Sequence, residues 1–418
     1  MNHPKRLLQI NVSLNTGSTG HIAENIARIA MADGWECYLI HGSRYKNPPS
    51  CMNTYQPGSI LDEYLHYAEH YFLDNDGLAS RHATRKLTDK IKKISPDIIQ
   101  IHNLHDHWLN YKILFEYLNT LDIPVVWTQH DCWAFTGGCV YYNISGCNRW
   151  RNGSCGKSCI IKRTPIFRHV LERTRHHFQL KRTLFNNTKN LVLISVSHWL
   201  ENELRQSFMK DRQVITIHNG IDLNIFQPYH GTDICAKYGL RHQKYVIGVA
   251  SKWEPRKGLN DYYRLAPLLA EIGIDTILVG LNSGQARTAA RNGITTVPRL
   301  ENVHELVALY SKAEAVMNLS YEETFGLTTV EGMACGTPVV VYDCTASPEL
   351  VSPETGIIVP PGNILQVKNA VETIIRNGKN YYTAACRDNA VQCYDKDKCY
   401  KEYINLYDKL LSENALHD

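Results

Sequence analysis

Two glutamates in the stretch ETFGLTTVE, residues 323–331, are the first candidates for chemistry in this sequence. Carboxylates accept paired hydrogen bonds from neighbouring sugar hydroxyls, so Glu331 suits a ribose and Glu323 a second sugar. Gly326 and Leu327 are expected to open a helix whose first N–H groups can hold an anion. Capping of that helix would explain Glu323 without any ligand. The spacing alone therefore leaves capping, catalysis and sugar recognition open.

Three cations follow an apolar stretch in the segment KWEPRKG, residues 252–258. Lys252, Arg256 and Lys257 stand directly after YVIGVAS, which reads as a strand, and before a helical pattern. Cations next to a helix N-terminus can neutralise a pyrophosphate without a divalent metal. The alternative is a solvated basic loop.

Two segments in the first half of the chain also follow predicted strands. His130 comes directly after IPVVWTQ and can serve as a hydrogen-bond donor or a base near neutral pH. Gly17 and Gly20 in NTGSTGH are expected in a turn before a helix, where the backbone can approach a phosphate or a sugar. A surface histidine and an ordinary turn are the alternatives.

Histidines and cysteines form two further clusters. His102, His105 and His107 in IHNLHDHW lack a carboxylate spacing typical of a metal site, so local hydrogen bonding is expected. The segment 132–159 contains five cysteines, and four of them could bind structural zinc: Cys139, Cys147, Cys155 and Cys159. No Cys-x2-Cys pair is present, so free or oxidisable thiols are the alternative.

The elements that must position these residues are short strands alternating with helices. This pattern is typical of α/β proteins with doubly wound parallel sheets, in which ligands bind beyond the carboxyl ends of strands. The pattern runs through the first half and restarts after VITIHNGIDLNIFQP, with a hinge expected at Asn219-Gly220. We therefore predict an N-terminal domain at 1–220 with the cysteine-rich insert 132–159, a second domain at 221–394, and a C-terminal helix at 395–418 that returns to the first domain.

Composition sets broad limits on function. The 418 residues are 44% hydrophobic and 21% charged, and the net charge is +4, which is too small to argue for nucleic acid. No apolar window approaches the roughly 18 residues of a membrane span, and the first residues do not read as a signal peptide. A cytoplasmic protein is expected. The basic segment 162–182 could form an amphipathic helix on anionic lipid on the cytoplasmic face, or an ordinary packed helix.

Taken together, these motifs resemble the family 4 glycosyltransferases. The resemblance rests on NTGSTG, TQHD, NGIDLNIFQP, KWEPRKG and ETFGLTTVEGMACGTPVV in this order and covers nearly the whole chain. It implies the GT-B fold, two Rossmann-like domains facing across a cleft, with acceptor binding in the first and nucleotide-sugar binding in the second. Within the family the chain looks most like bacterial enzymes that build capsular, exopolysaccharide or O-antigen repeat units.

The resemblance also implies a role for each motif residue. Lys257 would bind the donor diphosphate together with the amides of Gly326 and Leu327, Glu331 would hold the ribose, and Glu323 would contact the transferred sugar. His130 would lie near the reacting centre, and Gly17 and Gly20 would close over the donor. One position departs from the family pattern, which usually has Arg where this chain has Lys252, so Arg256 is expected to share that role.

The implied activity is a metal-independent, retaining hexosyl transfer. The donor would be a nucleoside diphosphate sugar, and the acceptor a glycan or a polyprenyl-diphosphate-linked glycan. A GT-B-type nucleotide-sugar epimerase is the alternative enzyme, although KWEPRKG and the paired glutamates fit it less well. A zinc-stabilised nucleic-acid-binding protein would use the cysteine cluster and the basic segment but leaves the motifs of the second half unexplained. NTGSTG is not the dinucleotide fingerprint, which disfavours a dehydrogenase.

Overall fold

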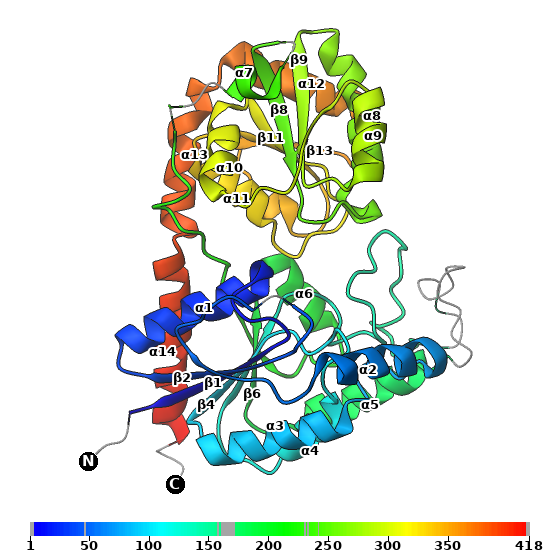
Figure 1. The fold of residues 1–418 in the computed structure, drawn as a ribbon, viewed down its shortest axis with the longest axis vertical. Helices are drawn as coiled ribbons and strands as arrows, with labels where there is room; N and C mark the ends of the chain where they lie inside the picture. The colour runs from blue at the N-terminus through cyan, green and yellow to red at the C-terminus, as the bar shows by residue number, and fades with distance from the viewer. Residues whose placement is uncertain are drawn as a thin grey trace. The chain divides into compact units, whose positions relative to one another are not determined.

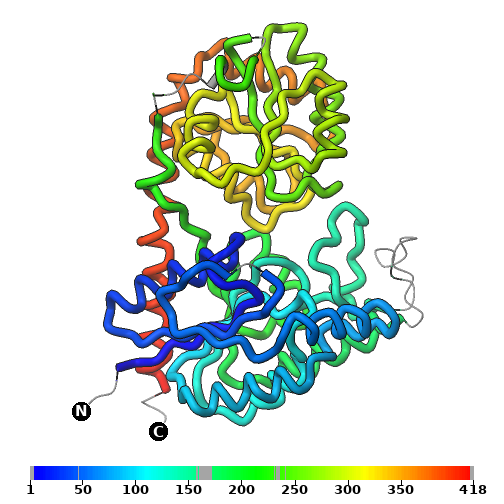
Figure 2. The backbone as a smooth tube through the Cα atoms, in the orientation of Figure 1, coloured from blue at the N-terminus to red at the C-terminus, as the bar shows by residue number. Residues whose placement is uncertain are grey.

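The chain folds into two compact units, each built around its own parallel sheet. The computed structural model describes residues 4–45, 47–156, 159, 172–229, 231, 234–240 and 242–414, without the side chains of 234 and 235. One unit comprises residues 1–217 and 397–418, and the other comprises residues 218–396. The N-terminal unit contains the blue and cyan segments, the first green segments with α5 and α6, and the red C-terminal helix; the second unit contains the later green, yellow and orange segments (Figures 1 and 2).

The N-terminal unit has seven parallel strands in the order β3-β2-β1-β4-β5-β6-β7. The inner strands are short runs of apolar residues buried along their whole length, as expected for a sheet covered on both faces. The bounds are β1 Arg6–Asn11, β2 Glu36–His41, β3 Asn53–Tyr55, β4 Ile98–Ile101, β5 Val125–Gln129, β6 Leu191–Ser195 and β7 Gln213–Thr216.

Helices connect these strands and cover the sheet. They are α1 Gly17–Ala32, α2 Ile60–Leu73, α3 Arg81–Ile94, α4 Tyr111–Leu118, α5 Thr174–Asn187 and α6 His198–Gln206. α3 ends at Ile94, and its C-cap Ser95 adopts a left-handed backbone before Pro96. Residues 162–171 of the predicted lipid-facing helix lie outside the described residues, and α5 begins at Thr174.

A long C-terminal helix completes the core of this unit. α14, Lys396–Asn414, places Tyr400, Tyr403, Ile404 and Tyr407 in one apolar cluster with residues of β1 and α1. Two of its tyrosines also make buried polar contacts with central strands. The Tyr407 hydroxyl donates to Gln100 Oε1 at 3.0 Å, and the Tyr403 hydroxyl accepts from Thr128 Oγ1 at 3.2 Å.

The second unit has six parallel strands in the order β10-β9-β8-β11-β12-β13. The strands are β8 Lys244–Val249, β9 Ile274–Val279, β10 Thr295–Val297, β11 Ala315–Asn318, β12 Val339–Tyr342 and β13 Gly356–Val359. The helices are α7 Ile234–Tyr238, α8 Leu259–Ala270, α9 Ser283–Arg291, α10 Val303–Lys312, α11 Leu327–Ala334, α12 Ile364–Asn377 and α13 Asn380–Cys393, with short 3-10 turns at Pro255–Lys257 and Ser347–Leu350.

These two sheets confirm the predicted α/β class with doubly wound parallel sheets. In the second unit, β8 and β11 are neighbours in the middle of the sheet. The segments KWEPRKG and ETFG therefore leave the sheet side by side at its carboxyl edge. Among the described residues, no helix is both long enough and apolar enough to cross a bilayer.

Candidate functional site

An ion pair joins the two loops at the carboxyl ends of β8 and β11. Lys257 Nζ donates to Glu323 Oε1, and the two side chains are only 19% and 11% exposed. Burial of Glu323 acts to raise its pKa, but the charge of Lys257, followed by that of Arg256, holds the pKa below its ordinary value. Glu323 is therefore ionised at neutral pH and lies against a cation.

The close approach of these loops depends on a glycine. Gly258 ends the turn Pro255–Lys257 with φ +68°, and a Cβ at this position would lie 2.1 Å from the Leu319 carbonyl oxygen. Arg256 ties the same loops together. Its Nη1 donates to the Glu322 carbonyl at 3.1 Å, and its own carbonyl accepts from Tyr321 N at 2.8 Å. Lys257 is thus held against the segment after β11 by contacts of its two neighbours, Arg256 and Gly258.

The predicted cations of KWEPRKG do not form one group. Arg256 and Lys257 both face the segment 319–323, whereas Lys252 is exposed. Among the described residues, no ion pair involves Lys252. Two of the three cations are therefore in position to act together on one anion.

The start of α11 lies next to this pair in sequence. Gly326 is the N-cap with φ +107°, and Leu327 begins the helix, as predicted. Asn318 Nδ2, at the end of β11, donates to Thr329 Oγ1 at 3.0 Å and holds the first turn against the sheet. The N–H groups and the dipole of this first turn are suited to an anion.

Glu331 lies within α11 in a different environment from Glu323. The Tyr310 hydroxyl donates to Glu331 Oε2 at 2.9 Å, and no cation pairs with this carboxyl among the described residues. Burial raises the pKa of Glu331 to about 7, although the Tyr310 hydrogen bond acts to lower it. A hydroxyl or cation arriving from a ligand would relieve the cost of ionising this carboxyl.

Sequence reasoning missed Asp261, which organises the same edge of the sheet. This buried carboxylate lies in the first turn of α8, and its Oδ2 accepts from the hydroxyls of Tyr321 at 2.6 Å and Tyr342 at 2.9 Å. An aspartate in a first turn is common at helix starts because it complements the helix dipole. In the sequence, only its position three residues after Gly258 indicated that Asp261 lies near the site.

A chain of hydrogen bonds fixes the tautomer of His130 in the N-terminal unit. Gln9 Nε2 donates to the Ala23 carbonyl at 2.8 Å, so Gln9 Oε1 accepts from His102 Nε2 at 2.9 Å. His102 is neutral because burial pushes its pKa well below the usual value. Its Nδ1 therefore accepts from His130 Nε2 at 3.0 Å. Burial also lowers the pKa of His130, to about 4, so both rings are neutral at pH 7.

The neighbouring His105 is charged instead. Burial would lower its pKa, but Asp131 at 2.7 Å and Asp106 at 3.4 Å raise that pKa well above the usual value. Asp131 also accepts from Trp133 N at 2.8 Å, so its carboxylate is fixed at both oxygens. His102 and His105 thus show the predicted local hydrogen bonding. For His107 the prediction was wrong, because neither of its buried ring nitrogens has a hydrogen-bond partner among the described residues.

The glycine turn differs from the prediction. α1 begins at Gly17, whose φ is +65°, so Gly20 lies inside the first turn of the helix and not before it. A Cβ on Gly20 would lie 3.1 Å from both Asn15 N and Ser13 Oγ. Gly20 therefore permits close packing of the loop on the helix.

Four cysteines of the insert line one small cavity. Cys139, Cys147, Cys155 and Cys159 surround a space of about 10 Å³, together with Trp150 and Tyr142. This is close to the volume needed by a single water or ion. Burial, with a smaller contribution from the nearby thiols of Cys147 and Cys159, raises the pKa of the Cys155 thiol to about 11.

Family models match both units of the chain. Residues 20–225 match the model described as Glycosyltransferase Family 4, and residues 243–377 match the model described as Glycosyl transferases group 1. The second match contains the segments around Lys257, Glu323 and Glu331, and the first contains His130.

Individual relatives differ in how much of the chain they match. The putative colanic acid biosynthesis glycosyl transferase WcaC of Escherichia coli K12 is 22% identical over 97% of this chain and 100% of its own length. The D-inositol 3-phosphate glycosyltransferase of Mycobacteroides abscessus is 30% identical, but the match spans only 40% of this chain and 41% of that enzyme.

Two solved structures share the fold along the whole chain. Sucrose-phosphate synthase from Thermosynechococcus elongatus superimposes with a TM-score of 0.72 at 18% identity, covering 98% of this chain and 100% of that one. Anabaena Alr3699/HepE in complex with UDP-glucose gives a TM-score of 0.65 at 16% identity, covering 97% and 99%.

Proposed function

The chain is a family 4 glycosyltransferase with the GT-B fold, and from this premise we propose that it transfers a hexosyl group from a nucleoside diphosphate sugar. The observation that carries the proposal is the Lys257–Glu323 pair, flanked by Arg256 and by the start of α11. A nearly buried cation, a second cation and free helix N–H groups provide what a diphosphate requires.

The donor would divide its groups among these residues. The diphosphate takes Lys257 as its partner and meets the Gly326 and Leu327 amides, while Arg256 supplies additional charge. Glu323, displaced from Lys257, is then available to accept hydrogen bonds from the hydroxyls of the transferred sugar. Glu331 accepts from the ribose hydroxyls, which would favour its ionised form. UDP-glucose bound to the Anabaena neighbour is consistent with this class of donor.

We propose transfer with retention of the anomeric configuration through a front-face mechanism. The bond between the anomeric carbon and the β-phosphate oxygen breaks, and the acceptor oxygen bonds to the same face of that carbon. The acceptor proton passes to the departing phosphate oxygen, so no protein nucleophile is needed. Lys257, Arg256 and the α11 N-terminus stabilise the charge that develops on the leaving diphosphate. No metal ion takes part in this mechanism.

His130 is the proposed contact of the N-terminal unit with the reacting sugar. Its ring is neutral and its Nε2–H is committed to His102, so the orientation of the ring is set before any ligand binds. The acceptor is proposed to be a glycan or a polyprenyl-diphosphate-linked glycan of a bacterial surface polysaccharide. The similarity to the WcaC protein along its whole length supports this pathway class.

The test measures nucleotide release from a panel of nucleoside diphosphate sugars, with and without lipid-linked acceptor. Lys257→Ala is expected to abolish turnover and to weaken nucleoside diphosphate binding about 10- to 100-fold, as for loss of a charge-assisted hydrogen bond. Lys244→Ala is the matched control, because Lys244 is exposed at the opposite end of β8. Turnover of Lys257→Ala at the wild-type rate would refute the assignment.

We also propose that the four cysteines around the cavity bind a structural zinc ion, which would fix the insert 132–159. Thiolate ligands suit zinc, and the thiols of Cys147 and Cys159 act on the pKa of Cys155. The sulfur atoms are further apart than the ligand atoms of one zinc ion, so binding would require these side chains to rotate into the cavity. Zinc analysis of protein purified without chelator tests this, with Cys155→Ser compared against Cys393→Ser, an exposed cysteine in α13. Equal zinc content in both variants would contradict the proposal.

Membrane association is proposed through α2. Eight large apolar side chains of this helix are exposed: Ile60, Leu61, Tyr64, Leu65, Tyr67, Tyr71, Phe72 and Leu73. The start of α2 adjoins α3, which exposes Arg81, Arg85, Lys86, Lys92 and Lys93. Apolar side chains next to cations fit the interface of an anionic membrane.

Vesicle sedimentation tests this surface. The wild-type protein is expected to sediment with phosphatidylglycerol vesicles, whereas Leu61→Glu/Leu65→Glu remains in the supernatant. Leu365→Glu is the matched control, since Leu365 on α12 is 65% exposed and Leu61 is 64% exposed. Equal binding by the double variant and the control would exclude α2 as the membrane contact.

A further inference from the structure

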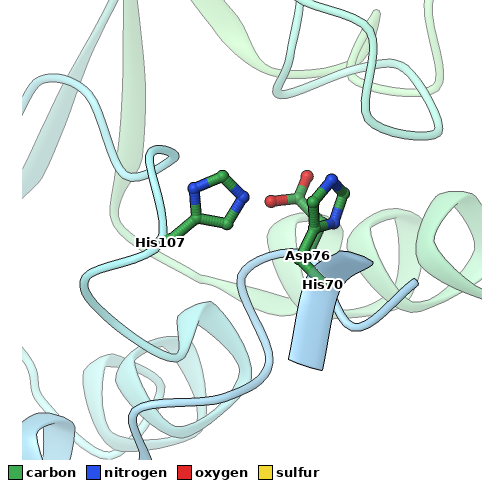
Figure 3. A group of neighbouring side chains, drawn as sticks. All are labelled: His70, Asp76 and His107. Atoms are coloured by element: carbon green, nitrogen blue, oxygen red, sulfur yellow. The ribbon is translucent and has the colours of Figure 1, made fainter. Parts of the chain in front are cut away.

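Three metal-ligating side chains from separate segments point toward one another in the N-terminal unit (Figure 3). His70 lies in the last turn of α2, Asp76 lies in the turn that follows, and His107 lies in the loop between β4 and α4. One ligand atom from each residue lies within 4.8 Å of the other two. Within the described part of the chain, no other such group of His, Cys, Asp and Glu meets this geometry.

Both ring nitrogens of His107 are buried, and neither has a hydrogen-bond partner among the described residues. Its backbone is left-handed, with φ +66°, directly after Asp106 with φ +77°. Burying unpaired nitrogens and holding two consecutive non-glycine residues in this conformation both cost free energy. A ligand for the ring would offset part of that cost.

Aromatic packing accounts for only part of this arrangement. The His107 ring lies 5.5 Å from His66, 5.3 Å from Tyr67 and 4.8 Å from His70, measured between ring centroids. These contacts hold the ring in place. None of them provides a hydrogen bond to a ring nitrogen of His107, so the burial of these nitrogens stays unexplained.

Asp76 is oriented by an outer partner, as metal-binding carboxylates usually are. Trp133 Nε1 donates to Asp76 Oδ2 at 3.1 Å, which leaves lone pairs on the carboxylate for an ion. Two cations lie near the group, and the charge of Lys181 helps to hold the pKa of Asp76 below its ordinary value, but both cations have other partners as well. Lys181 Nζ donates to the Trp133 carbonyl at 2.7 Å, and Arg44 lies 3.8 Å from Glu63.

We propose that His70, Asp76 and His107 bind a divalent transition-metal ion, zinc being the probe of choice. Two imidazoles and one carboxylate form a ligand set that suits zinc, and water would complete the coordination. Ligand atoms around tetrahedral zinc are about 3.4 Å apart, so side-chain rotations must close at most about 1.4 Å.

The ion would join the end of α2 to the loop after β4. That loop also carries His102 and His105, which hydrogen-bond to His130 and Asp131. Metal binding would therefore hold the segment that orients His130, as a positioning element and not as a participant in glycosyl transfer.

The experiment uses the full-length protein stripped of metal with a chelator and then dialysed against zinc chloride. His107→Asn removes the imidazole with a residue that tolerates a left-handed backbone. Asp76→Asn keeps an oxygen that can accept from Trp133. His82→Gln, an exposed histidine on α3, is the matched control. Because all cysteines are retained, the difference between variants isolates this group from any ion held by thiolates.

Wild type and His82→Gln are expected to bind about one zinc per chain more than His107→Asn and Asp76→Asn. Saturating zinc should also raise the melting temperature of the wild type by roughly 5 °C more than that of either variant. Cobalt substituted for zinc should show visible ligand-field bands that Asp76→Asn lacks. If His107→Asn does not fold, Asp76→Asn decides alone. Equal zinc content in wild type and folded Asp76→Asn overturns the proposal.

Discussion

Replacing Glu331 by glutamine is expected to stabilise the ligand-free protein at pH 8 and at the same time weaken donor binding. Burial raises the pKa of Glu331 from 4.5 to about 7 in the folded protein. Between these two pH values the folded chain holds more protons than the unfolded chain, so this group makes stability fall as pH rises. Above about pH 7 the loss is complete and no longer changes with pH.

The size of the effect follows from the same shift. A rise of the Glu331 pKa from 4.5 to about 7 corresponds to about 3 kcal/mol of unfolding free energy, and the partial exposure of this side chain reduces the effect to roughly 1–3 kcal/mol. The Glu331→Gln side chain keeps an oxygen for the Tyr310 hydroxyl, so the packing of α11 is preserved. The variant should thus match the wild type near pH 4.5 and exceed it by that amount at pH 8.

Urea unfolding followed by circular dichroism at several pH values measures the difference between variant and wild type, which cancels the titration of all other groups. Glu271→Gln, at an exposed position after α8, is the matched control for the chemical change. Nucleoside diphosphate affinity, measured by calorimetry, should fall at least about tenfold in Glu331→Gln. A variant no more stable than wild type at pH 8, or one that binds nucleotide normally, would refute this reasoning.

Three further outcomes are expected. Lys257→Met should destabilise the protein by about 3 kcal/mol, because Glu323 stays buried without its main partner. Adding Glu323→Gln should restore most of that stability but not nucleotide binding. If urea unfolding shows that the losses of the two single variants add up in the double variant, this explanation is contradicted. Gly258→Ala should cost at least about 2 kcal/mol and also weaken donor binding, since its Cβ would displace the loop from Leu319; a folded variant with normal nucleotide affinity would argue against that coupling. Burial lowers the pKa of His130 to about 4, so between pH 6.5 and pH 4 this side chain is protonated in the unfolded chain but not in the folded one. The free energy of unfolding therefore decreases as the pH is lowered through this window. His130→Gln should reduce that decrease by roughly 1–3 kcal/mol in acid titrations.

The architecture could be predicted from the sequence because local patterns determine it. Runs such as VVWTQ and LVLIS are mainly apolar and buried on both faces, as is typical of a covered parallel strand, and a parallel sheet fixes where each strand-end loop emerges. The placement of Lys257, Gly326 and Glu331 at one edge followed from this rule. Gly20 was misplaced because glycine is a poor helix former, and here tertiary packing overrides that preference.

The pairings within the site could not be predicted, because they join residues far apart in the chain. Lys257 and Glu323 are separated by 66 positions, and nothing local indicates that one carboxyl is ionised while Glu331 is held near its neutral form. The group of His70, Asp76 and His107 could not be predicted for the same reason, since its three side chains come from a helix, a turn and a distant loop. α2 was also missed, as exposed apolar residues all along it obscure the usual helical period.

The return of α14 to the first unit has a consequence for how the protein is made on the ribosome. Residues 218–396 must all be synthesised before Tyr400, Tyr403 and Tyr407 emerge to cover the cluster around β1 and α1. At ordinary translation speed, this apolar surface waits roughly 10–40 s for its cover. The second unit, whose strands are contiguous in the chain, can fold during that interval. The part of the enzyme synthesised first is therefore the last to be finished, and it is the part that chaperones and proteases would meet incomplete.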